Sequence, residues 1–330
     1  MKSIDLTNFK DQKVLIRVDY NVPLDDNFNV TDTTRIERTR ETINKVIGDG
    51  GIAILMSHLG RPKGEANDKF SLKHIVDTVS KVLGKDVLFA GDVLSTEAAD
   101  KVAQLKPGDI ALLENLRFHP EEEKGDLEFA KAIARLGDVY VNDAFGTAHR
   151  EHASTATIAR CFPGKAYAGY LLYNEVVNLE KVINCQARPF TAIIGGSKVS
   201  TKINILMNLL PKVDNLIVGG GLSYTFLAAM GLKIGNSLYE PDMLPVAKQI
   251  LAQVDATGTN FFCRLDSVCG DHFGNDAQVM IPKDNNIPDG WEGLDIGPKS
   301  RRNIAQAIKN SSTILWNGPV GVFELEKFSK

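Results

Sequence analysis

The sequence predicts an α/β protein made of two Rossmann-like lobes of parallel sheet, joined by a connecting helix. Short apolar runs rich in branched residues alternate with helical patterns along the chain, which is typical of strands buried in parallel sheets. Several of these runs end directly in Asn, Arg, His or Gly-rich segments. A long helical pattern near the middle separates two sets of elements, and it predicts the connection between the lobes.

The first half of the chain contains predicted strands that each end in a polar cluster. The strands cover residues 13–18, 52–56, 110–113 and 139–141, and the clusters cover 19–23, 57–62, 114–117 and 142–152. Helical patterns lie between the strands, such as the one formed by Ile36, Ile43, Val46 and Ile47. The strands should therefore be parallel, with their carboxyl ends on one rim. Open α/β sheets bind ligands at such a rim.

Basic side chains on this rim indicate an anionic ligand. His58 and Arg61 lie in a tight Gly-Pro loop after the second strand, a geometry suited to a phosphate or carboxylate. An isolated His/Arg pair is more often a solvated turn, but polar clusters after four strands argue against that interpretation. Thr34 and Glu37 form a capping-box signature, which predicts Arg35 in the first turn of the next helix. A cation is unfavourable there unless an anion binds beside it or Arg35 extends into water.

The second half begins with a predicted strand at 190–194, a turn at 195–197 and a helix that opens with residues 198–202. The apolar stripe of this helix is Val199, Ile203, Leu206 and Leu210. Lys198 and Lys202 would then be i,i+4 neighbours in the opening turns, where two ammonium groups repel each other and the helix dipole. A Gly-rich turn before a helix is also a phosphate cradle, although a Walker A sequence is absent. A bound anion would explain both features.

Two further predicted strands, at 216–218 and 313–316, lead into segments suited to a nucleotide. The glycine run 219–221 lets a flat ligand or phosphate approach the backbone, but it lacks the Gly-x-Gly-x-x-Gly spacing of a dinucleotide site. Glu324 follows the second of these strands, and a carboxylate beside such a rim commonly accepts hydrogen bonds from ribose hydroxyls. A surface glutamate without a ligand is the commoner interpretation of any single Glu.

Length and composition limit the class of protein. The 330 residues suggest about two domains, and 43% hydrophobic with 24% charged residues is ordinary for a soluble globular protein. A net charge of −3 gives no basic field, so no nucleic-acid partner is expected. No apolar stretch suits a signal peptide or membrane span, and Cys161, Cys185, Cys263 and Cys269 form no Cys-x-x-Cys pair. We therefore expect a cytoplasmic protein with reduced thiols and no membrane partner.

The predicted domain boundaries follow the long helical pattern. Its stripe is Leu172, Val176, Leu179 and Ile183, and Arg188-Pro189 should stop the helix before the next strand. The chain is thereby divided into a first domain at 1–170, a connecting helix and hinge at 171–188, and a second domain at 189–330. The charge run at 121–125 is expected to be a solvated loop without chemistry.

Together these features predict a first lobe that binds a small anion and a second lobe that binds a nucleotide. Phosphoryl transfer between two bound ligands needs placement, charge neutralisation and exclusion of water more than a protein nucleophile. The sequence has no Ser/His/Asp or Cys/His constellation, which fits such a reaction. A nicotinamide-dependent dehydrogenase is the alternative on fold alone, and the missing dinucleotide glycine spacing disfavours it.

Six segments of the chain resemble the phosphoglycerate kinase family. They are RVDYNVP at 17–23, SHLGRP at 57–62, ENLR at 114–117, NDAFGTAHR at 142–150, GGSKVSTK at 195–202 and WNGP at 316–319. They follow the family's order over essentially the whole chain. The resemblance implies reversible transfer of the acyl phosphate of 1,3-bisphosphoglycerate to Mg-ADP in glycolysis and gluconeogenesis, giving 3-phosphoglycerate and ATP. It also implies closure of the two lobes about the connecting helix, and we expect a monomer.

The resemblance assigns site residues through the matched motifs. The triose-phosphate site would comprise Asp19, Asn21, Arg35, His58, Leu59, Gly60, Arg61, Arg117 and Arg150, with His152 nearby. The nucleotide site would comprise Lys198, Lys202, Gly219, Gly220, Gly293, Asn317 and Glu324. Arg35, Lys198 and Lys202 would be the catalytic cations. Mg²⁺ would accompany ADP or ATP, and no residue of this chain is assigned as a metal ligand.

The chain departs from the family's pattern at its end. Members of the family continue past the equivalent of Phe328 for several elements, including a Gly-Gly-Gly-Asp-Thr turn whose Asp binds nucleotide-bound Mg²⁺. Without that turn we expect an incomplete second lobe with an uncovered sheet edge, weaker Mg-ATP binding and reduced turnover. The alternative function is therefore a truncated 3-phosphoglycerate-binding protein with weak or no activity. A smaller departure is Arg264, two residues before Asp266, where the family usually has a proline.

Overall fold

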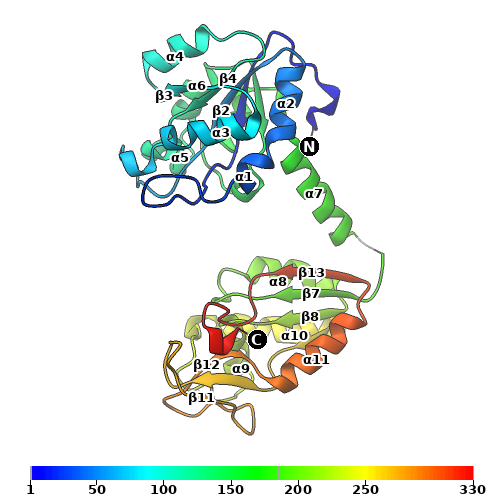
Figure 1. Cartoon of the computed structure of the whole chain (residues 1–330). Coiled ribbons are helices and arrows are strands. Elements are labelled where there is room, and N and C mark those ends of the chain that lie inside the picture. The colour runs from blue at the N-terminus through cyan, green and yellow to red at the C-terminus, as the bar shows by residue number, and fades with distance from the viewer. Residues whose placement is uncertain (1, 185, 330) are drawn as a thin grey trace. The chain divides into compact units, whose positions relative to one another are not determined.

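A computed structural model describes residues 2–184 and 186–329 (Figure 1). The chain divides into two compact units, Met1–Leu179 and Glu180–Lys330, and the division falls inside the predicted connecting segment. Among the described residues, no helix is long and apolar enough to cross a membrane. The prediction made for Cys185 lies outside the described residues.

The first unit is built on a six-stranded parallel sheet with the strand order β3-β4-β2-β1-β5-β6. Its strands are β1 (Lys13–Arg17), β2 (Ile52–Met56), β3 (Val87–Gly91), β4 (Ile110–Leu113), β5 (Val139–Asn142) and β6 (Ala166–Ala168). Four of them fall on the predicted strands, and their parallel pairing confirms the predicted crossovers. The edge strands β3 and β6 were missed, because Leu88 of β3 faces solvent and β6 has only 3 residues.

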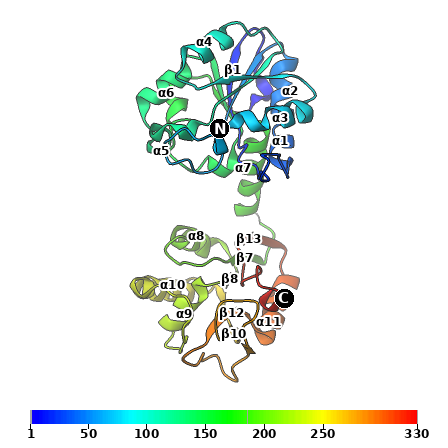
Figure 2. The same ribbon diagram turned by 60° about the vertical axis from the view of Figure 1, so that its left-hand side comes forward.

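Helices cover both faces of this sheet (Figure 2). They are α1 (Thr34–Glu37), α2 (Arg40–Gly48), α3 (Val76–Leu83), α4 (Thr96–Ala103), α5 (Pro120–Lys124) and α6 (Leu127–Ala134). Side chains alternate along β1, so Val14 and Ile16 pack with α2 and α3, whereas Leu15 packs with α4 and α6 on the opposite face. These two apolar layers hold the strands in place beneath the loops at their carboxyl ends.

The second unit contains a parallel and an antiparallel sheet. The parallel sheet has the order β13-β7-β8-β9, with β7 (Phe190–Ile194), β8 (Asn215–Val218), β9 (Asn260–Phe262) and β13 (Thr313–Asn317). It confirms the prediction of a second α/β lobe. The antiparallel sheet was not predicted; it has the order β11-β10-β12, with β10 (Ser267–Gly270), β11 (Val279–Met280) and β12 (Glu292–Ile296).

Helices also flank the parallel sheet of the second unit. They are α8 (Ile203–Leu209), α9 (Leu222–Ala229), α10 (Leu244–Thr257) and α11 (Pro298–Lys309). The first three share one apolar cluster with the sheet, while α11 and β12 pack on its other face. Short 3-10 helices lie at Ile4–Leu6, Asp68–Phe70, Leu72–Ile75, Leu116–Phe118, Phe145–Thr147, Thr157–Cys161, Leu210–Lys212, Pro241–Met243 and Glu326–Phe328.

The helix α7 (Tyr170–Ile183) lies at the boundary between the two units. Leu172 is its only buried residue, and Val176, Leu179 and Ile183 are each only half-buried. The predicted stripe of Leu172, Val176, Leu179 and Ile183 is therefore not a buried face. Because the boundary falls inside the helix, its middle turns belong to neither core.

The start of α1 differs from the predicted capping box. The N-cap residue is Thr33, whose side chain makes no capping hydrogen bond, and the N–H of Thr34 donates to Asp32 Oδ1 at 2.8 Å. Glu37 accepts a hydrogen bond from the Thr33 hydroxyl at 2.7 Å, instead of pairing with Thr34. Arg35 still lies in the first turn, as predicted.

The start of α8 was predicted too early. This helix begins at Ile203, so Lys198 and Lys202 lie in the turn before it and not in its opening turns. The cause is Glu240, whose carboxylate accepts hydrogen bonds from the N–H and hydroxyl of Ser200 at 3.0 and 2.6 Å. These contacts hold the backbone in a turn where the sequence alone favours a helix.

Candidate active site

Loops from the carboxyl ends of β1, β2 and β4 meet around Gly60 in the first unit. Asn21 Oδ1 accepts a hydrogen bond from the Gly60 N–H at 2.8 Å, and Arg117 Nη1 donates to the Gly60 carbonyl at 3.0 Å. Gly60 has a φ of +60°, and a Cβ there would overlap the Phe70 ring. These hydrogen bonds hold the loops of the predicted rim together and bring residues from three strands close to one another.

Arg35 reaches the same rim from α1. Its Nη1 atom lies 2.5 Å from Asp19 Oδ2, and Asp19 Oδ1 lies 3.8 Å from His58 Nδ1. The side chain of Arg35 is 49% exposed and that of Asp19 only 17%. Asp19 therefore offsets the unfavourable position of a cation at a helix start, while half of Arg35 stays accessible to a ligand.

His58 is buried and electrically neutral. Burial, followed by the charges of Arg17, Arg117, Arg150 and Arg35, lowers the pKa of His58 to about 2. Arg17 Nη2 lies 3.3 Å from His58 Nδ1, and a guanidinium can only donate. Nδ1 therefore accepts, which assigns the ring proton to Nε2. His58 is a neutral hydrogen-bond donor among cations, an arrangement suited to an anionic ligand.

Arg17 is a further member of this cluster and is not among the predicted site residues. It is the last residue of β1 and only 1% exposed. Its Nε donates to the Ser154 hydroxyl at 2.8 Å, and its Nη1 donates to the Val18 carbonyl. A signal was present in the sequence, because a charge at the end of an apolar buried strand persists only where partners satisfy it.

A fully buried carboxylate, Glu122, lies behind Arg17. The expectation of a solvated loop at 121–125 is wrong, because most of this run belongs to α5, which turns Glu122 inward. Ser154 donates to Glu122 from its hydroxyl at 2.6 Å and from its N–H at 2.9 Å. Glu122 also lies 4.0 Å from His152 Nδ1, which is buried and has no hydrogen-bond partner among the described residues. A chain of contacts therefore runs from Glu122 through Ser154 to Arg17.

The other predicted arginines of the first unit differ in how they relate to this core of the site. Arg117 Nε lies 3.1 Å from Glu123, and burial lowers the pKa of Arg117. Arg61 and Arg150 are exposed. The charge of Arg150 nevertheless lowers the pKa of His58, so Arg150 acts in the same electrostatic field.

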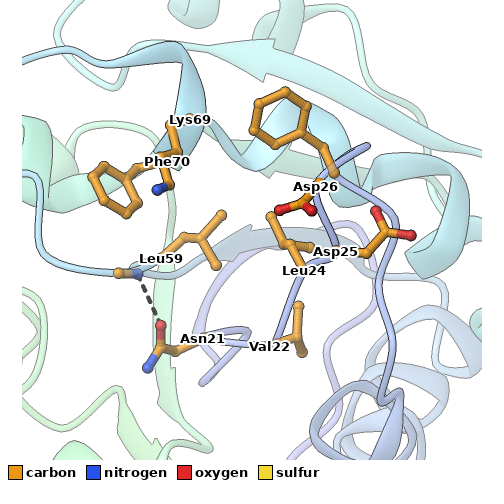
Figure 3. Close-up of a pocket in the computed structure, with 10 residues that line it drawn as sticks. Asn21, Val22, Leu24, Asp25, Asp26, Leu59, Lys69 and Phe70 are labelled. Carbon is orange, nitrogen blue, oxygen red and sulfur yellow. Dashed lines mark hydrogen bonds between the residues drawn. The ribbon is translucent and has the colours of Figure 1, made fainter.

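Two cavities adjoin this cluster. The smaller, of about 230 Å³, is lined by Asp19, Arg35, Arg38, Thr39, Phe145, Gly146, Leu171 and Glu175. The larger, of about 460 Å³, is lined by Asn21, Val22, Leu24, Asp25, Asp26, Phe28, Leu59, Gly60, Lys69 and Phe70 (Figure 3). It shares Asn21, Leu59 and Gly60 with the predicted site but none of the arginines. The position of the arginines is therefore a better guide to the candidate anion site than the size of the adjoining cavity.

In the second unit, glycine-rich loops after β7, β8 and β13 touch one another. Gly220 has a φ of +69°, and its N–H donates to the Val320 carbonyl at 2.7 Å. A Cβ on Gly220 would overlap the Gly196 carbonyl, and one on Gly195 would overlap the Pro319 carbonyl. Glycine is thus required where these loops approach each other.

The two predicted lysines lie on the loop after β7. Lys202 Nζ donates to Asn317 Oδ1 at 2.6 Å, which brings two predicted residues together from 115 positions apart. Lys198 is exposed and Lys202 is half-buried. Both ammonium groups can therefore reach a ligand that approaches from solvent.

A cavity of about 650 Å³ lies beside these loops. It is lined by Gly196, Ser197, Gly220, Gly221, Tyr224, Leu238, Phe273, Glu292, Gly293, Leu294, Pro319, Gly321, Val322 and Glu324. Gly220, Gly293 and Glu324 were predicted. Gly219 does not line the cavity, because it packs against Val320, where a Cβ would lie 2.6 Å from the Val320 Cβ. We call this space the glycine-loop cavity.

The apolar walls of the glycine-loop cavity were not predicted from the sequence. They come from Tyr224, Leu238 and Phe273. Leu238 and Phe273 are 51% and 62% exposed, which is unusual for large apolar side chains. No sequence pattern distinguishes an apolar residue that faces a ligand from one that packs in a core.

A divalent cation would take oxygen ligands from the chain, from a nucleotide or from water. Within residues 2–184 and 186–329, no group of three or more His, Cys, Asp or Glu side chains is placed to hold a metal ion. Asn317 Oδ1 is already engaged by Lys202. These residues therefore do not fit a resident metal centre.

The fold and the two sites define a class of protein. One α/β unit carries a cluster of basic side chains at the carboxyl ends of its strands, and the other carries glycine loops, two lysines and a cavity of about 650 Å³. This combination is typical of an enzyme that transfers a phosphoryl group.

Comparisons with known proteins agree on one family. The family model described as phosphoglycerate kinase matches residues 4–330. The phosphoglycerate kinase of Porphyromonas gingivalis is 49% identical, over 99% of this chain and 84% of that protein. The cytosolic phosphoglycerate kinase 3 of Arabidopsis thaliana is 48% identical, over 100% of this chain and 81% of that protein. The structure of phosphoglycerate kinase from Coxiella burnetii superposes with a TM-score of 0.84 at 38% identity, covering 99% of this chain and 82% of that one.

The chain belongs to the phosphoglycerate kinase family. This confirms the predicted family, the predicted α/β fold class and the predicted phosphotransferase activity. The alternative of a nicotinamide-dependent dehydrogenase is wrong. The family is one of nucleotide-dependent kinases.

Proposed function

We propose that the first unit binds 3-phosphoglycerate or 1,3-bisphosphoglycerate, and that the second binds ADP or ATP for reversible phosphoryl transfer. The observation that best supports this is the neutral His58 among four arginines on the rim of the first unit. A phosphorylated carboxylate carries several negative charges, which arginine neutralises through paired hydrogen bonds. His58 would add a hydrogen bond to this ligand without adding charge.

The geometry of the first unit supports most of the ligand contacts proposed here. Arg35, Arg61, Arg117 and Arg150 would bind the anionic groups, with His58 and His152 donating beside them. Asp19 and Asn21 would orient Arg35 and the loop at Leu59 and Gly60. Arg35, half exposed at the edge of the site, would also stabilise the transferring phosphoryl group.

The proposed ligand contacts of the second unit lie around the glycine-loop cavity. Lys198 and Lys202 would face the phosphates, with Asn317 holding Lys202 in place. Gly220 and Gly293 would allow the adenosine to lie against the backbone, Gly219 would support the Gly220 turn, and Glu324 would accept from ribose hydroxyls. Mg²⁺ would enter with the nucleotide, bound mainly by phosphate oxygens and water.

The proposed setting is a cytoplasmic monomer without nucleic-acid or membrane partners. The net charge of −3 supports the absence of a nucleic-acid partner. Closure of the two units about the connecting segment stays a prediction.

The direct test is to incubate the chain with Mg-ATP and 3-phosphoglycerate and to measure ADP release. We expect ADP release to be much faster with 3-phosphoglycerate than with glycerate, which lacks the phosphate, and negligible when neither is added. ADP release that does not depend on 3-phosphoglycerate would contradict the proposal. Calorimetric binding of 3-phosphoglycerate without any turnover would instead identify a binding protein.

A further inference from the structure

Arg264 is a buried arginine that the proposed ligand contacts do not include. It is 2% exposed, and it follows β9 on the side of the glycine-loop cavity. Among residues 2–184 and 186–329 it has no ion-pair partner, although its charge acts on Asp295 from a greater distance. A buried guanidinium without a carboxylate is costly unless its N–H groups are satisfied otherwise.

Arg264 joins two loops that line the glycine-loop cavity. Its Nη2 donates to the carbonyl of Gly220 at 2.9 Å and to the carbonyl of Val320 at 3.3 Å. Its Nε donates to the Ser223 hydroxyl at 2.6 Å, and that hydroxyl donates in turn to the Gly220 carbonyl at 2.7 Å. One side chain thereby fixes the spacing between the loop after β8 and the loop after β13.

Arg264 also fixes one wall of the cavity. Its guanidinium carbon lies 4.3 Å from the centroid of the Tyr224 ring, and its Nη1 donates to the Tyr224 hydroxyl at 2.5 Å. The Tyr224 hydroxyl fills the space that a Cβ on Gly293 would need. Stacking and hydrogen bonding together leave the Tyr224 ring one orientation against Gly293.

We propose that Arg264 is a positioning residue for nucleotide binding. It does not line the glycine-loop cavity, so it acts through Gly220, Val320 and Tyr224, whose spacing determines whether ADP fits. A lysine cannot replace it, because only the planar guanidinium donates in several fixed directions at once. This inference rests on the proposal that the second unit binds ADP.

The test compares ADP binding by the whole chain and by two variants. Arg264→Met keeps an apolar stem but loses every donor, and Arg264→Lys keeps the charge but loses the planar group. Isothermal calorimetry should give a dissociation constant for ADP that is roughly tenfold higher in Arg264→Met and several-fold higher in Arg264→Lys. The dissociation constant for 3-phosphoglycerate should not change. The control is Arg302→Met, an exposed position on α11, which should leave both constants unchanged.

The readouts separate positioning from general stability. A merely structural role would lower the fraction of protein able to bind and the unfolding temperature, but would leave the dissociation constant for ADP unchanged. That result would overturn the inference about Arg264 but would leave the proposed nucleotide site intact. If the unaltered chain fails to bind ADP at millimolar concentration, the proposed nucleotide site fails and the inference fails with it. If Arg264→Met does not fold, Ser223→Ala decides: a higher dissociation constant for ADP supports the inference, and an unchanged one overturns it.

Discussion

Arg17 Nη2 lies 3.3 Å from His58 Nδ1, and both side chains are buried where β1 and β2 end. Burial disfavours the charged imidazole, and the adjacent guanidinium disfavours it further. The contact therefore couples the protonation of His58 to the placement of Arg17, which Ser154 and Glu122 hold from behind.

The first prediction concerns stability in acid. The pKa of His58 is about 2 in the folded chain and 6.5 when unperturbed, so the unfolded state binds this proton first as the pH falls. The contribution of His58 to the free energy of unfolding is complete above pH 6.5 and declines progressively below it. His58→Asn cannot take up the proton, so it should lose less stability than the unaltered chain between about pH 7.5 and 5, in urea unfolding. Parallel pH profiles for the two proteins would contradict this prediction.

The second prediction concerns Glu122. Glu122→Gln removes a buried charge and turns an amide N–H₂ toward Ser154, so it should lower the free energy of unfolding by about 2–3 kcal/mol. Affinity for 3-phosphoglycerate should fall as well, since Ser154 positions Arg17. Glu128→Gln, at an exposed position on α6, is the matched control. In the same urea titration its free energy of unfolding should stay within ~0.5 kcal/mol of that of the unaltered chain. If the two substitutions have equal effects, Glu122 does not stabilise the chain of contacts that runs through Ser154 to Arg17.

The third prediction concerns Lys202. Lys202→Ala should lower turnover roughly a hundredfold, equivalent to ~3 kcal/mol, if the ammonium stabilises the transferring phosphoryl group. The side chain is half-buried and its one hydrogen bond goes to Asn317, so the unfolding temperature should change little. Lys212→Ala, at an exposed position of the same unit, should alter neither quantity. Unchanged turnover in Lys202→Ala would exclude this lysine from catalysis.

The fourth prediction separates backbone strain from steric overlap at Gly60. Gly60 and Gly84 both have positive φ, +60° and +69°, but a Cβ on Gly84 would meet nothing within 4 Å. Gly84→Ala should therefore lower the free energy of unfolding by about 1 kcal/mol, from backbone conformation alone. Gly60→Ala should cost about 1–3 kcal/mol more, because its Cβ overlaps the Phe70 ring, and it should weaken binding of 3-phosphoglycerate. Similar unfolding free energies for the two variants would show that the Phe70 ring moves aside freely.

Sequence patterns identified the strands that are buried on both faces. The runs at 52–56 and 110–113 coincide with β2 and β4, since continuous apolar residues between polar ends leave few alternatives. The antiparallel strands β10, β11 and β12 were missed. They are only 2–5 residues long, and β10 and β12 contain Gly, Ser, Asp or Glu, so their pairing depends on tertiary contacts more than on local preference.

The candidate site was predicted where residue chemistry is visible in the sequence, as for His58 and Lys202. Glu122 was missed because its burial depends on a distant partner, Ser154, which no local pattern reveals. Arg17 did carry a local signal, its place at the end of an apolar strand, but its partner Ser154 lies 137 positions away. The start of α8 was missed for a related reason, since Glu240 competes for the backbone of Ser200 from 40 positions away. Long-range hydrogen bonds outweigh local preference in each case.

The central position of β1 in its sheet has a consequence for synthesis of the chain. β1 pairs with β2 on one side and with β5 on the other, and the N–H of Lys13 donates to Asp138, 125 positions later. β1 is the first strand to leave the ribosome, and it cannot pair with β5 until nearly the whole first unit has been translated. During that interval an apolar strand presents an open edge, which invites pairing with other nascent chains. The unit should consequently fold late and as a whole, and a nascent chain stalled before β5 should depend on chaperones to stay unaggregated.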